Sequence, residues 1–294
     1  MSKERLLIID GFNLLSRGYF ATAYNKSEEQ LSRNSSGLYT NALRVFFQKL
    51  FNLIEEHEIT HLAIAWDVKR EETARRQKYD FYKATRGELP FPLIQQYETL
   101  TQYLEKIGVY QLTLAPYEAD DLIGTLARQW SSSEGRTCLI YSNDKDLLQL
   151  LGPRTSQIIA QKRTEITYTL QHFKDEYGIE PAQWIDVKAL LGDASDNVPG
   201  VAGVGAKSAL PLIQDYQTIE QLYERVDQLD PKYNRYQKKL IAGKESARIS
   251  KELVTINCLI EHQTLFTDER MMLAFEKELV KQTLHQLEVK VRIS

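Results

Sequence analysis

Three carboxylates stand within four positions of the stretch YEADDLIG, residues 117–124. Glu118, Asp120 and Asp121 repel one another, and the residues after them turn apolar at helical spacing. Asp is a favourable N-cap residue, so Asp120 is a candidate for simply capping the helix that follows. The alternative is a site for positive charge, because crowded carboxylates stay ionised only where a cation neutralises them.

These acids belong to a pattern that extends over the first half of the chain. Short apolar runs at residues 6–9, 61–66, 110–114 and 137–141 predict β-strands, and apolar residues at helical spacing separate one run from the next. This alternation predicts an α/β fold with a largely parallel central sheet flanked by helices. A hairpin or a pair of edge strands is expected at 156–160 and 165–169.

An acid follows every one of the four strand runs. The carboxyl ends of parallel strands share one edge of a sheet, and open α/β sheets form their sites there. Any one of these acids is explained equally well as a surface residue or a helix cap, but the repetition favours a common site. The acids expected at this edge are Asp10, Asp67, Glu118, Asp120, Asp121, Asp144 and Asp146, and Asp193 and Asp196 follow in the stretch LLGDASDNVPG.

The ligand types indicate which cation would suit such a site. Carboxylates without histidine or cysteine are hard oxygen ligands, which suit Mg²⁺ or Mn²⁺ rather than zinc. The five histidines are scattered, with no metal-ligand spacing. Two such ions side by side serve phosphodiester hydrolysis, since one activates water and the other stabilises the leaving oxygen.

Composition sets the frame for this chemistry. The 294 residues are 43% hydrophobic, enough for one large domain or a large one with a small partner. The net charge of −3 argues neither for nor against nucleic acid. Cys138 and Cys258 form no CxxC pair, and no apolar run is long enough for a signal peptide or a membrane span, so a cytoplasmic location is expected.

The strand signal fades near residue 174, where a second, helical region is predicted to begin.

Two stretches are strongly basic despite the negative net charge. Residues 68–87 hold seven Lys or Arg against three acids, with aromatic residues between them. Residues 231–251 hold seven Lys or Arg and one acid. Basic residues follow a phosphate backbone and aromatic residues stack on unpaired bases, so both stretches are candidate nucleic-acid surfaces. A solvated helix face is the alternative in each case.

The glycines of VPGVAGVGAKSA, residues 198–209, do not form a nucleotide loop. Ala206 separates Gly205 from Lys207, and no strand precedes the stretch, which excludes a P-loop. A helix–hairpin–helix element fits better, because glycine lets the backbone approach a phosphate at the start of a helix. Pro211 falls inside the expected second helix, so that helix either starts later or bends.

Taken in order, these stretches resemble the flap endonuclease superfamily, which includes the 5′→3′ exonuclease domain of bacterial DNA polymerase I and the phage flap endonucleases. The resemblance covers almost the whole chain. It is carried by LLIIDGFNLLSRGYFA, AIAWD, YKATR, APYEADDLIG, SNDKDLLQLL, GDASDNVPGVAGVGAKSA and ARISKELVTI. It implies a stand-alone bacterial enzyme with a PIN-like, resolvase-like core in residues 1–173, a helical arch over about 68–92, and a helical DNA-binding region in 174–294 that contains the helix–hairpin–helix element at about 190–215.

The resemblance also implies roles for individual residues. Asp10, Asp67, Glu118, Asp120 and Asp144 would surround the hydrolytic Mg²⁺ or Mn²⁺, and Asp121, Asp146, Asp193 and Asp196 would line a second metal site or its outer shell. Lys83 and Arg86 would contact the scissile phosphate and the threaded 5′ strand. The other expected DNA contacts are Arg17, Tyr19, Tyr82, Gly200, Gly203, Gly205, Lys207 and Ser208, with Lys238 and Lys239 from the basic stretch. A K⁺ ion is implied at the backbone of Val198, Val201 and Val204.

The expected partner is DNA with a 5′ flap or a junction between single strand and duplex, with RNA-primed ends as a further candidate, and the expected state is a monomer. Two rival functions stay open at this point. A metal-dependent ribonuclease of related fold explains the acids but not the hairpin that grips duplex. A DNA-junction binding protein without turnover explains the basic stretches but not the clustered acids.

Overall fold

The computed structural model describes residues 4–161, 164–261 and 267–293. Within these residues the centre is a six-stranded sheet in the order β3-β2-β1-β4-β5-β6. The strands are β1 (Glu4–Asp10), β2 (His61–Ala65), β3 (Gln111–Leu112), β4 (Arg136–Tyr141), β5 (Thr155–Gln161) and β6 (Thr164–Tyr168). All pairings are parallel except that of β5 with β6, which is the expected hairpin. The α/β prediction is confirmed, and the strand expected at 110–114 is shorter than predicted.

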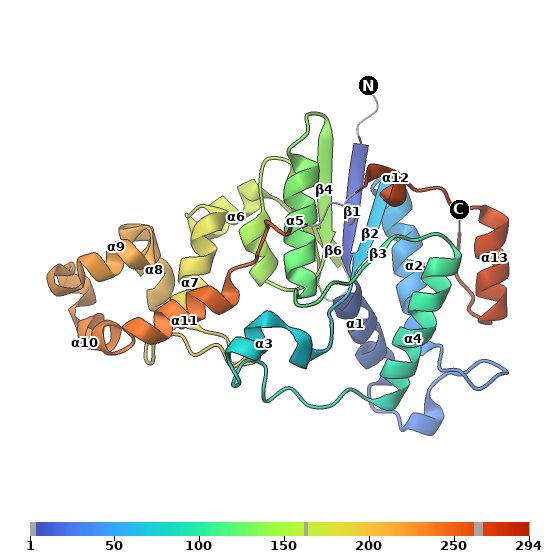
Figure 1. Ribbon diagram of the computed structural model, residues 1–294, viewed down its shortest axis with the longest axis horizontal. Helices are drawn as coiled ribbons and strands as arrows, with labels where there is room; N and C mark the ends of the chain where they lie inside the picture. The colour runs from blue at the N-terminus through green and yellow to red at the C-terminus, as the bar shows by residue number, and fades with distance from the viewer. Residues whose placement is uncertain (1–3, 162–163, 262–266, 294) are drawn as a thin grey trace.

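Helices cover both faces of this sheet (Figure 1). One face carries α1 (Gly11–Ala23), α2 (Asn41–Glu56) and α4 (Phe91–Lys106), and the other carries α5 (Ala119–Ser131). Side chains alternate along a strand, so Leu7 and Ile9 of β1 enter the first core, and Leu6 and Ile8 enter the second. Burial on both faces explains why the strands are continuous apolar runs rather than alternating patterns.

The helical lobe lies at one end of the molecule (Figure 1, left). Its own apolar core runs from Leu148 to Ala247 and so begins before the boundary expected near residue 174. Its helices are α6 (Leu170–Tyr177), α7 (Trp184–Leu191), α8 (Ala206–Tyr216), α9 (Ile219–Glu224), α10 (Asn234–Ala242) and α11 (Lys244–Val254).

The chain then returns to the sheet, which corrects the expectation of one helical region over 174–294. Ile256 and Met271 are buried in the core under α5, and Val280 and Leu284 are buried in the core of the opposite face. The last helices, α12 (Asp268–Met271) and α13 (Lys277–Gln286), accordingly flank the sheet, with α13 at the far end from the lobe (Figure 1). The sequence shows that residues in this C-terminal part are apolar, but it does not show which of the two cores they join.

The segment expected to form a helical arch, 68–92, contains little helix. Its regular parts are a 3₁₀ turn and a five-residue helix, α3 (Ala74–Lys78), which lies across the strand ends (Figure 1). The 3₁₀ turns are η1 (Glu28–Gln30), η2 (Arg70–Glu72), η3 (Asp146–Leu150), η4 (Pro181–Gln183), η5 (Val226–Gln228) and η6 (Pro231–Tyr233).

Two smaller expectations are also resolved. Helix α8 starts at Ala206 and contains Pro211, so the idea of a later start is wrong. Proline has no N–H, and the carbonyl four residues earlier therefore loses its usual helical bond. Among the described residues, no helix is long and apolar enough to cross a membrane.

Candidate active site

Four of the predicted acids lie together at the carboxyl edge of the sheet. Asp10 is the last residue of β1, Asp67 and Asp144 follow β2 and β4, and Asp120 lies in the first turn of α5. Local structure fixes each one. The backbone N–H of Asn13 donates to Asp10 Oδ1 (3.0 Å), that of Ala119 to Asp67 (2.8 Å) and that of Asp146 to Asp144 (2.8 Å). Asp10 is thus an N-cap as well as a site residue, whereas Asp120 does not cap its helix.

Burial and neighbouring carboxylates destabilise the charged forms of Asp10 and Asp120. Burial, with Asp67 and Asp144 beside it, raises the pKa of Asp10 to about 7. Burial and the charges of Asp144, Asp10 and Asp67 raise the pKa of Asp120 well above its usual value. Two hydrogen bonds, from the Asn13 amide and the Ser142 hydroxyl (2.9 Å), only partly offset this at Asp10. Each pKa unit corresponds to about 1.4 kcal/mol, so the ionised cluster carries a real electrostatic cost.

The cluster fits a divalent ion by its chemistry. Its donors are carboxylate oxygens, which Mg²⁺ and Mn²⁺ prefer, and a bound cation would remove the repulsion that raises these pKa values. Among the described residues, no three acidic, histidine or cysteine side chains already converge on one point. The four carboxylates are therefore electrostatic neighbours and not a finished coordination cage.

The other acids of YEADD differ from Asp120, because cations of segment 68–92 neutralise them. Arg75 makes a two-pronged ion pair with Asp121 (2.7 and 2.8 Å) and also reaches Glu118 (3.0 Å). Lys83 donates to the other oxygen of Glu118 (2.7 Å), and the Tyr82 hydroxyl adds a bond of 3.2 Å. Asp121 also accepts from the backbone of Asn257 and Glu118. We therefore correct the expectation for Asp121: its oxygens are taken by structural partners.

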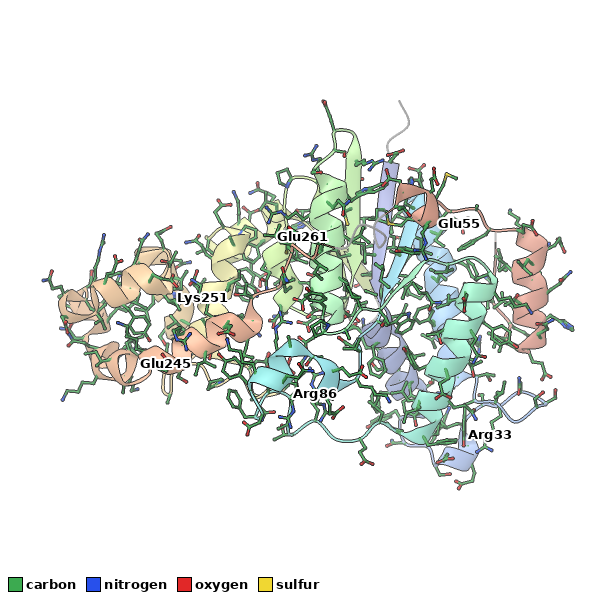
Figure 2. The ribbon with its side chains drawn as sticks, in the orientation of Figure 1. Arg33, Glu55, Arg86, Glu245, Lys251 and Glu261 are labelled. Atoms are coloured by element: carbon green, nitrogen blue, oxygen red, sulfur yellow. The ribbon has the colours of Figure 1, made fainter. Side chains whose placement is uncertain are left out.

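The acids expected at a second site are paired in the same way. Lys188 of α7 lies 2.8 Å from both Asp146 and Asp193. Burial would raise the pKa of Asp193, but Lys188 and the hydrogen bonds from Ser195 outweigh it and bring the pKa to about 2. Asp196 accepts from Arg86 Nε (3.0 Å), and its backbone carbonyl accepts from the Lys83 amide (2.9 Å). Figure 2 shows Arg86 beneath the strand ends, beside the lobe.

Sequence reasoning missed Lys188 and treated Arg75 only as part of a charge run. A single lysine within the apolar run of WIDVKALL was the available signal for Lys188, because an unpaired lysine is rarely buried. The local sequence does not distinguish Arg75 from Arg76. Their roles differ because only the Arg75 side chain reaches the acids at the start of α5.

Two tyrosines expected to contact DNA are buried, which corrects their assignment. Tyr82 is 4% exposed and packs with Val198, Leu253 and Val254. Tyr19 is 6% exposed and belongs to the core under α1. Neither ring is free to meet a base in this conformation. Arg17 hydrogen-bonds the Asn143 side chain near the same edge of the sheet.

The glycine hairpin divides into structural and accessible parts. Gly200 packs backbone to backbone against Gly192, and its amide bonds Ser250 Oγ (2.8 Å), so it serves the turn. Ser208 is buried and its hydroxyl bonds Gly205, which likewise removes it from the accessible surface. Gly203, Gly205 and Lys207 are exposed, as are Lys238 and Lys239 of α10. The carbonyls of Val198 and Val201 accept bonds from the amides of Asp193 and Val204 (both 2.9 Å).

Comparisons with known proteins place the chain in a family. Residues 5–178 match the model of the 5'-3' exonuclease N-terminal resolvase-like domain, and residues 179–277 match that of the 5'-3' exonuclease C-terminal SAM fold. A 5'-3' exonuclease of Halalkalibacterium halodurans is 60% identical over all of this chain and 97% of its own length. DNA polymerase I of Lactococcus lactis is 39% identical over 87% of this chain, which spans only 29% of that polymerase.

A solved structure repeats the fold at low sequence identity. The bacteriophage T5 flap endonuclease, crystallised in a pseudo-enzyme-product complex with DNA and metal ions, is 22% identical with a TM-score of 0.67. The alignment covers 97% of this chain and 100% of that one. With two family models spanning nearly its whole length and a relative 60% identical from end to end, the chain belongs to the 5'-3' exonuclease family and is a 5'-3' nuclease.

Proposed function

We propose that the chain is a metal-dependent 5′→3′ exonuclease and flap endonuclease that hydrolyses DNA at 5′ ends and at junctions between single strand and duplex, leaving a 5′-phosphate. One observation supports this most: of the nine predicted acids, Asp10, Asp67, Asp120 and Asp144 have no ion-pair partner among the described residues. Family membership disfavours the rival of a binding protein without turnover. The rival ribonuclease function is tested below with an RNA flap substrate.

Residues of the chain would divide the work as follows. Bound Mg²⁺ or Mn²⁺ would supply Lewis acidity and an activated water. Asp10, Asp67, Asp120 and Asp144 would hold a first ion, with Asp10 kept in place by Asn13 and Ser142, and Asp146 and Asp193 would hold a second. Lys83, whose ammonium donates to Glu118 and lies near Asp67, would contact the scissile phosphate. Arg86 would add positive charge once it releases Asp196.

The DNA duplex would lie along the helical lobe. Gly203, Gly205 and Lys207 at the start of α8, together with Lys238 and Lys239 of α10, form an exposed basic surface suited to a phosphate backbone. A K⁺ ion at the carbonyls of Val198, Val201 and Val204 would add to this grip. The T5 flap endonuclease, whose fold is similar, was crystallised with DNA and metal ions, which supports a DNA partner here. Residues 1–173 would then act as the catalytic domain, with segment 68–92 above the site.

Three further expectations belong to this proposal. RNA-primed 5′ ends are candidate substrates, because backbone contacts carry no sequence readout. The protein is expected to act as a monomer in the cytoplasm. The two cysteines support a reducing location, since both Cys138 and Cys258 are free thiols.

The test is cleavage of a labelled 5′-flap duplex by the full chain in Mg²⁺, with a blunt duplex and an RNA flap alongside, and with EDTA as the control. We expect cleavage near the junction of the DNA flap that EDTA abolishes. Cleavage of the RNA substrate alone would establish the ribonuclease, and binding without cleavage in Mg²⁺ or Mn²⁺ would contradict the catalytic proposal.

A further inference from the structure

Helix α7 buries a lysine at the edge of the carboxylate site. Lys188 is 8% exposed, in a helix whose neighbouring residues Val187, Ala189 and Leu190 belong to the apolar cores. Its ammonium lies 2.8 Å from Asp146 Oδ1 and 2.8 Å from Asp193 Oδ2. The lysine therefore joins two chain segments that are far apart in sequence, η3 and the turn after α7.

The pairing divides the acids into two halves with opposite electrostatics. Burial and the neighbouring carboxylates raise the pKa values of Asp10 and Asp120. None of the four acids Asp10, Asp67, Asp120 and Asp144 has a cation at ion-pair distance among the described residues. Asp146 and Asp193 share one cation, the ammonium of Lys188. The halves touch, because the amide of Asp146 donates to Asp144 Oδ1 (2.8 Å) and the charge of Asp144 acts on Asp146. A single positive charge thus sits where the carboxylates of the second half would receive a metal.

We propose that Lys188 is a built-in cation of the second metal position: it holds Asp146 and Asp193 together when no metal is bound there, and a divalent ion has to displace it. The inference rests on the proposed metal site and adds a residue that sets its order of filling. A divalent ion brings twice the charge of an ammonium but must first break two short ion pairs. The second ion therefore binds more weakly than the first, at Asp10, Asp67, Asp120 and Asp144, whose repulsion favours metal from the outset.

Lysine suits such a role better than arginine would. Its ammonium is a compact charge on a flexible stem of four carbons, so it can leave two carboxylates by rotation without moving α7. The neighbouring bonds show that Asp193 keeps other support when the lysine leaves. Asp193 Oδ1 still accepts from the Ser195 amide (2.9 Å) and hydroxyl (2.6 Å), and its own amide is bonded to Val198.

The experiment measures Mn²⁺ binding by calorimetry and by the EPR signal of free Mn²⁺, on the full chain without DNA, so that no turnover is involved. We expect a tight and a weaker class of site in the natural protein. Lys188→Met should tighten the weaker class at least about tenfold and leave the tight class unchanged. It should also lower the melting temperature in EDTA, because two carboxylates lose their partner, and Mn²⁺ should recover most of that loss.

Lys251 provides a matched control. Its ammonium bridges Asp186 and Glu220 at 2.7 Å each, on α11 and away from the strand ends (Figure 2). Lys251→Met should likewise lower the melting temperature in EDTA but leave both Mn²⁺ classes as they are. Lys188→Arg retains the charge and should keep the weaker class weak. Lys188→Gln, which keeps a hydrogen-bond donor for both acids, replaces the Met variant if the latter does not fold, with the same expected tightening.

Unchanged or weaker binding of the second class in folded Lys188→Met or Lys188→Gln would overturn the inference and leave Lys188 as a purely structural ion pair. A natural protein that binds a single Mn²⁺ class, with the variant also binding one, would overturn it as well. Absence of any Mn²⁺ binding at millimolar concentration is a different result: it would remove the proposed metal site itself, and the role of Lys188 with it.

Discussion

The nine acids of this site are alike in sequence and unlike in charge environment. Arg75 and Lys83 hold Asp121 and Glu118, Lys188 holds Asp146 and Asp193, and Arg86 holds Asp196. The remaining four carboxylates lie close together at the strand ends and repel one another. At the scale of the residue, stability without metal and activity with metal should therefore respond in opposite directions to mutation of those four.

Asp120→Asn removes a carboxylate that accepts no hydrogen bond from the described residues and whose pKa is raised by burial and by the charges of three neighbours. Cleavage of flap DNA in Mg²⁺ should fall at least about 100-fold, because a metal ligand is lost. The melting temperature in EDTA should stay the same or rise, since a repulsive charge is gone. A variant with full activity in Mg²⁺ would refute the metal assignment, and Asp175→Asn on the exposed face of α6 serves as the control.

The pKa of Asp10 predicts a pH dependence of the metal-free protein. The folded value is about 7 and the unfolded value about 4, so between them the folded state binds the extra proton. As far as this group is concerned, stability in EDTA should therefore be greatest below about pH 4 and should fall as pH rises from about 4 to about 7. The loss is up to roughly 4 kcal/mol.

Asp10→Asn is the variant that isolates this group, because asparagine caps a helix as well as aspartate does and so keeps the bond from Asn13. The measurement is urea unfolding at several pH values in EDTA. The difference between variant and natural protein should grow with pH, and a difference independent of pH would contradict the assignment.

At the scale of the element, one side chain of segment 68–92 contacts both the sheet domain and the helical lobe. The guanidinium of Arg75 on α3 reaches Asp121 and Glu118 of the α5 cap, and also the carbonyls of Leu253 (3.0 Å) and Thr255 (2.7 Å) at the end of α11. It thereby joins the segment, the sheet domain and the helical lobe. A five-residue helix has little stability of its own, so this anchor positions it.

Arg75→Met should cost about 3–5 kcal/mol of unfolding free energy, because it leaves Asp121 and Glu118 with less than their full complement of partners in a buried setting. Limited proteolysis should then cut within 68–92 faster than in the natural protein. Arg76→Met is the matched control, since among the described residues the Arg76 guanidinium makes one long bond, 3.4 Å, to the carbonyl of Tyr82. Equal effects of the two substitutions would show that the anchor is not specific to Arg75.

At the scale of the whole molecule, the proposed catalytic site and the proposed duplex-binding surface lie in different parts of the fold. The lobe that carries α8 and α10 projects from one end of the sheet, and α13 closes the other end (Figure 1). The net charge of −3 conceals this arrangement, because the basic stretch 231–251 lies almost entirely on the lobe. Duplex held there would reach the strand ends past α3.

Replacing Lys238 and Lys239 by alanine should therefore weaken duplex binding through its salt dependence. Each phosphate neutralised contributes about −0.9 to the slope of log affinity against log salt, so the slope should flatten by up to about two units. The measurement is binding to flap and blunt duplex across a salt series in Ca²⁺. Lys281→Ala on α13, at the opposite end, should leave the slope unchanged. An unchanged slope in the double variant would mean that α10 presents only a solvated face.

The sequence by itself determined the strands, their order of occurrence and the type of chemistry. Apolar runs buried on both faces and the acid after each run are local signals, and the geometry of a parallel sheet brings such residues to one edge whatever the details. Only the tertiary structure decided which of these acids have an ion-pair partner and which do not. Arg75 and Lys188 find Asp121, Asp146 and Asp193 across long sequence separations, and Tyr19 and Tyr82 are buried by elements that local spacing does not specify. The return of residues 256–261 and 267–293 to the sheet has the same cause, because the spacing of apolar residues predicts that a helix face is buried but not which element covers it.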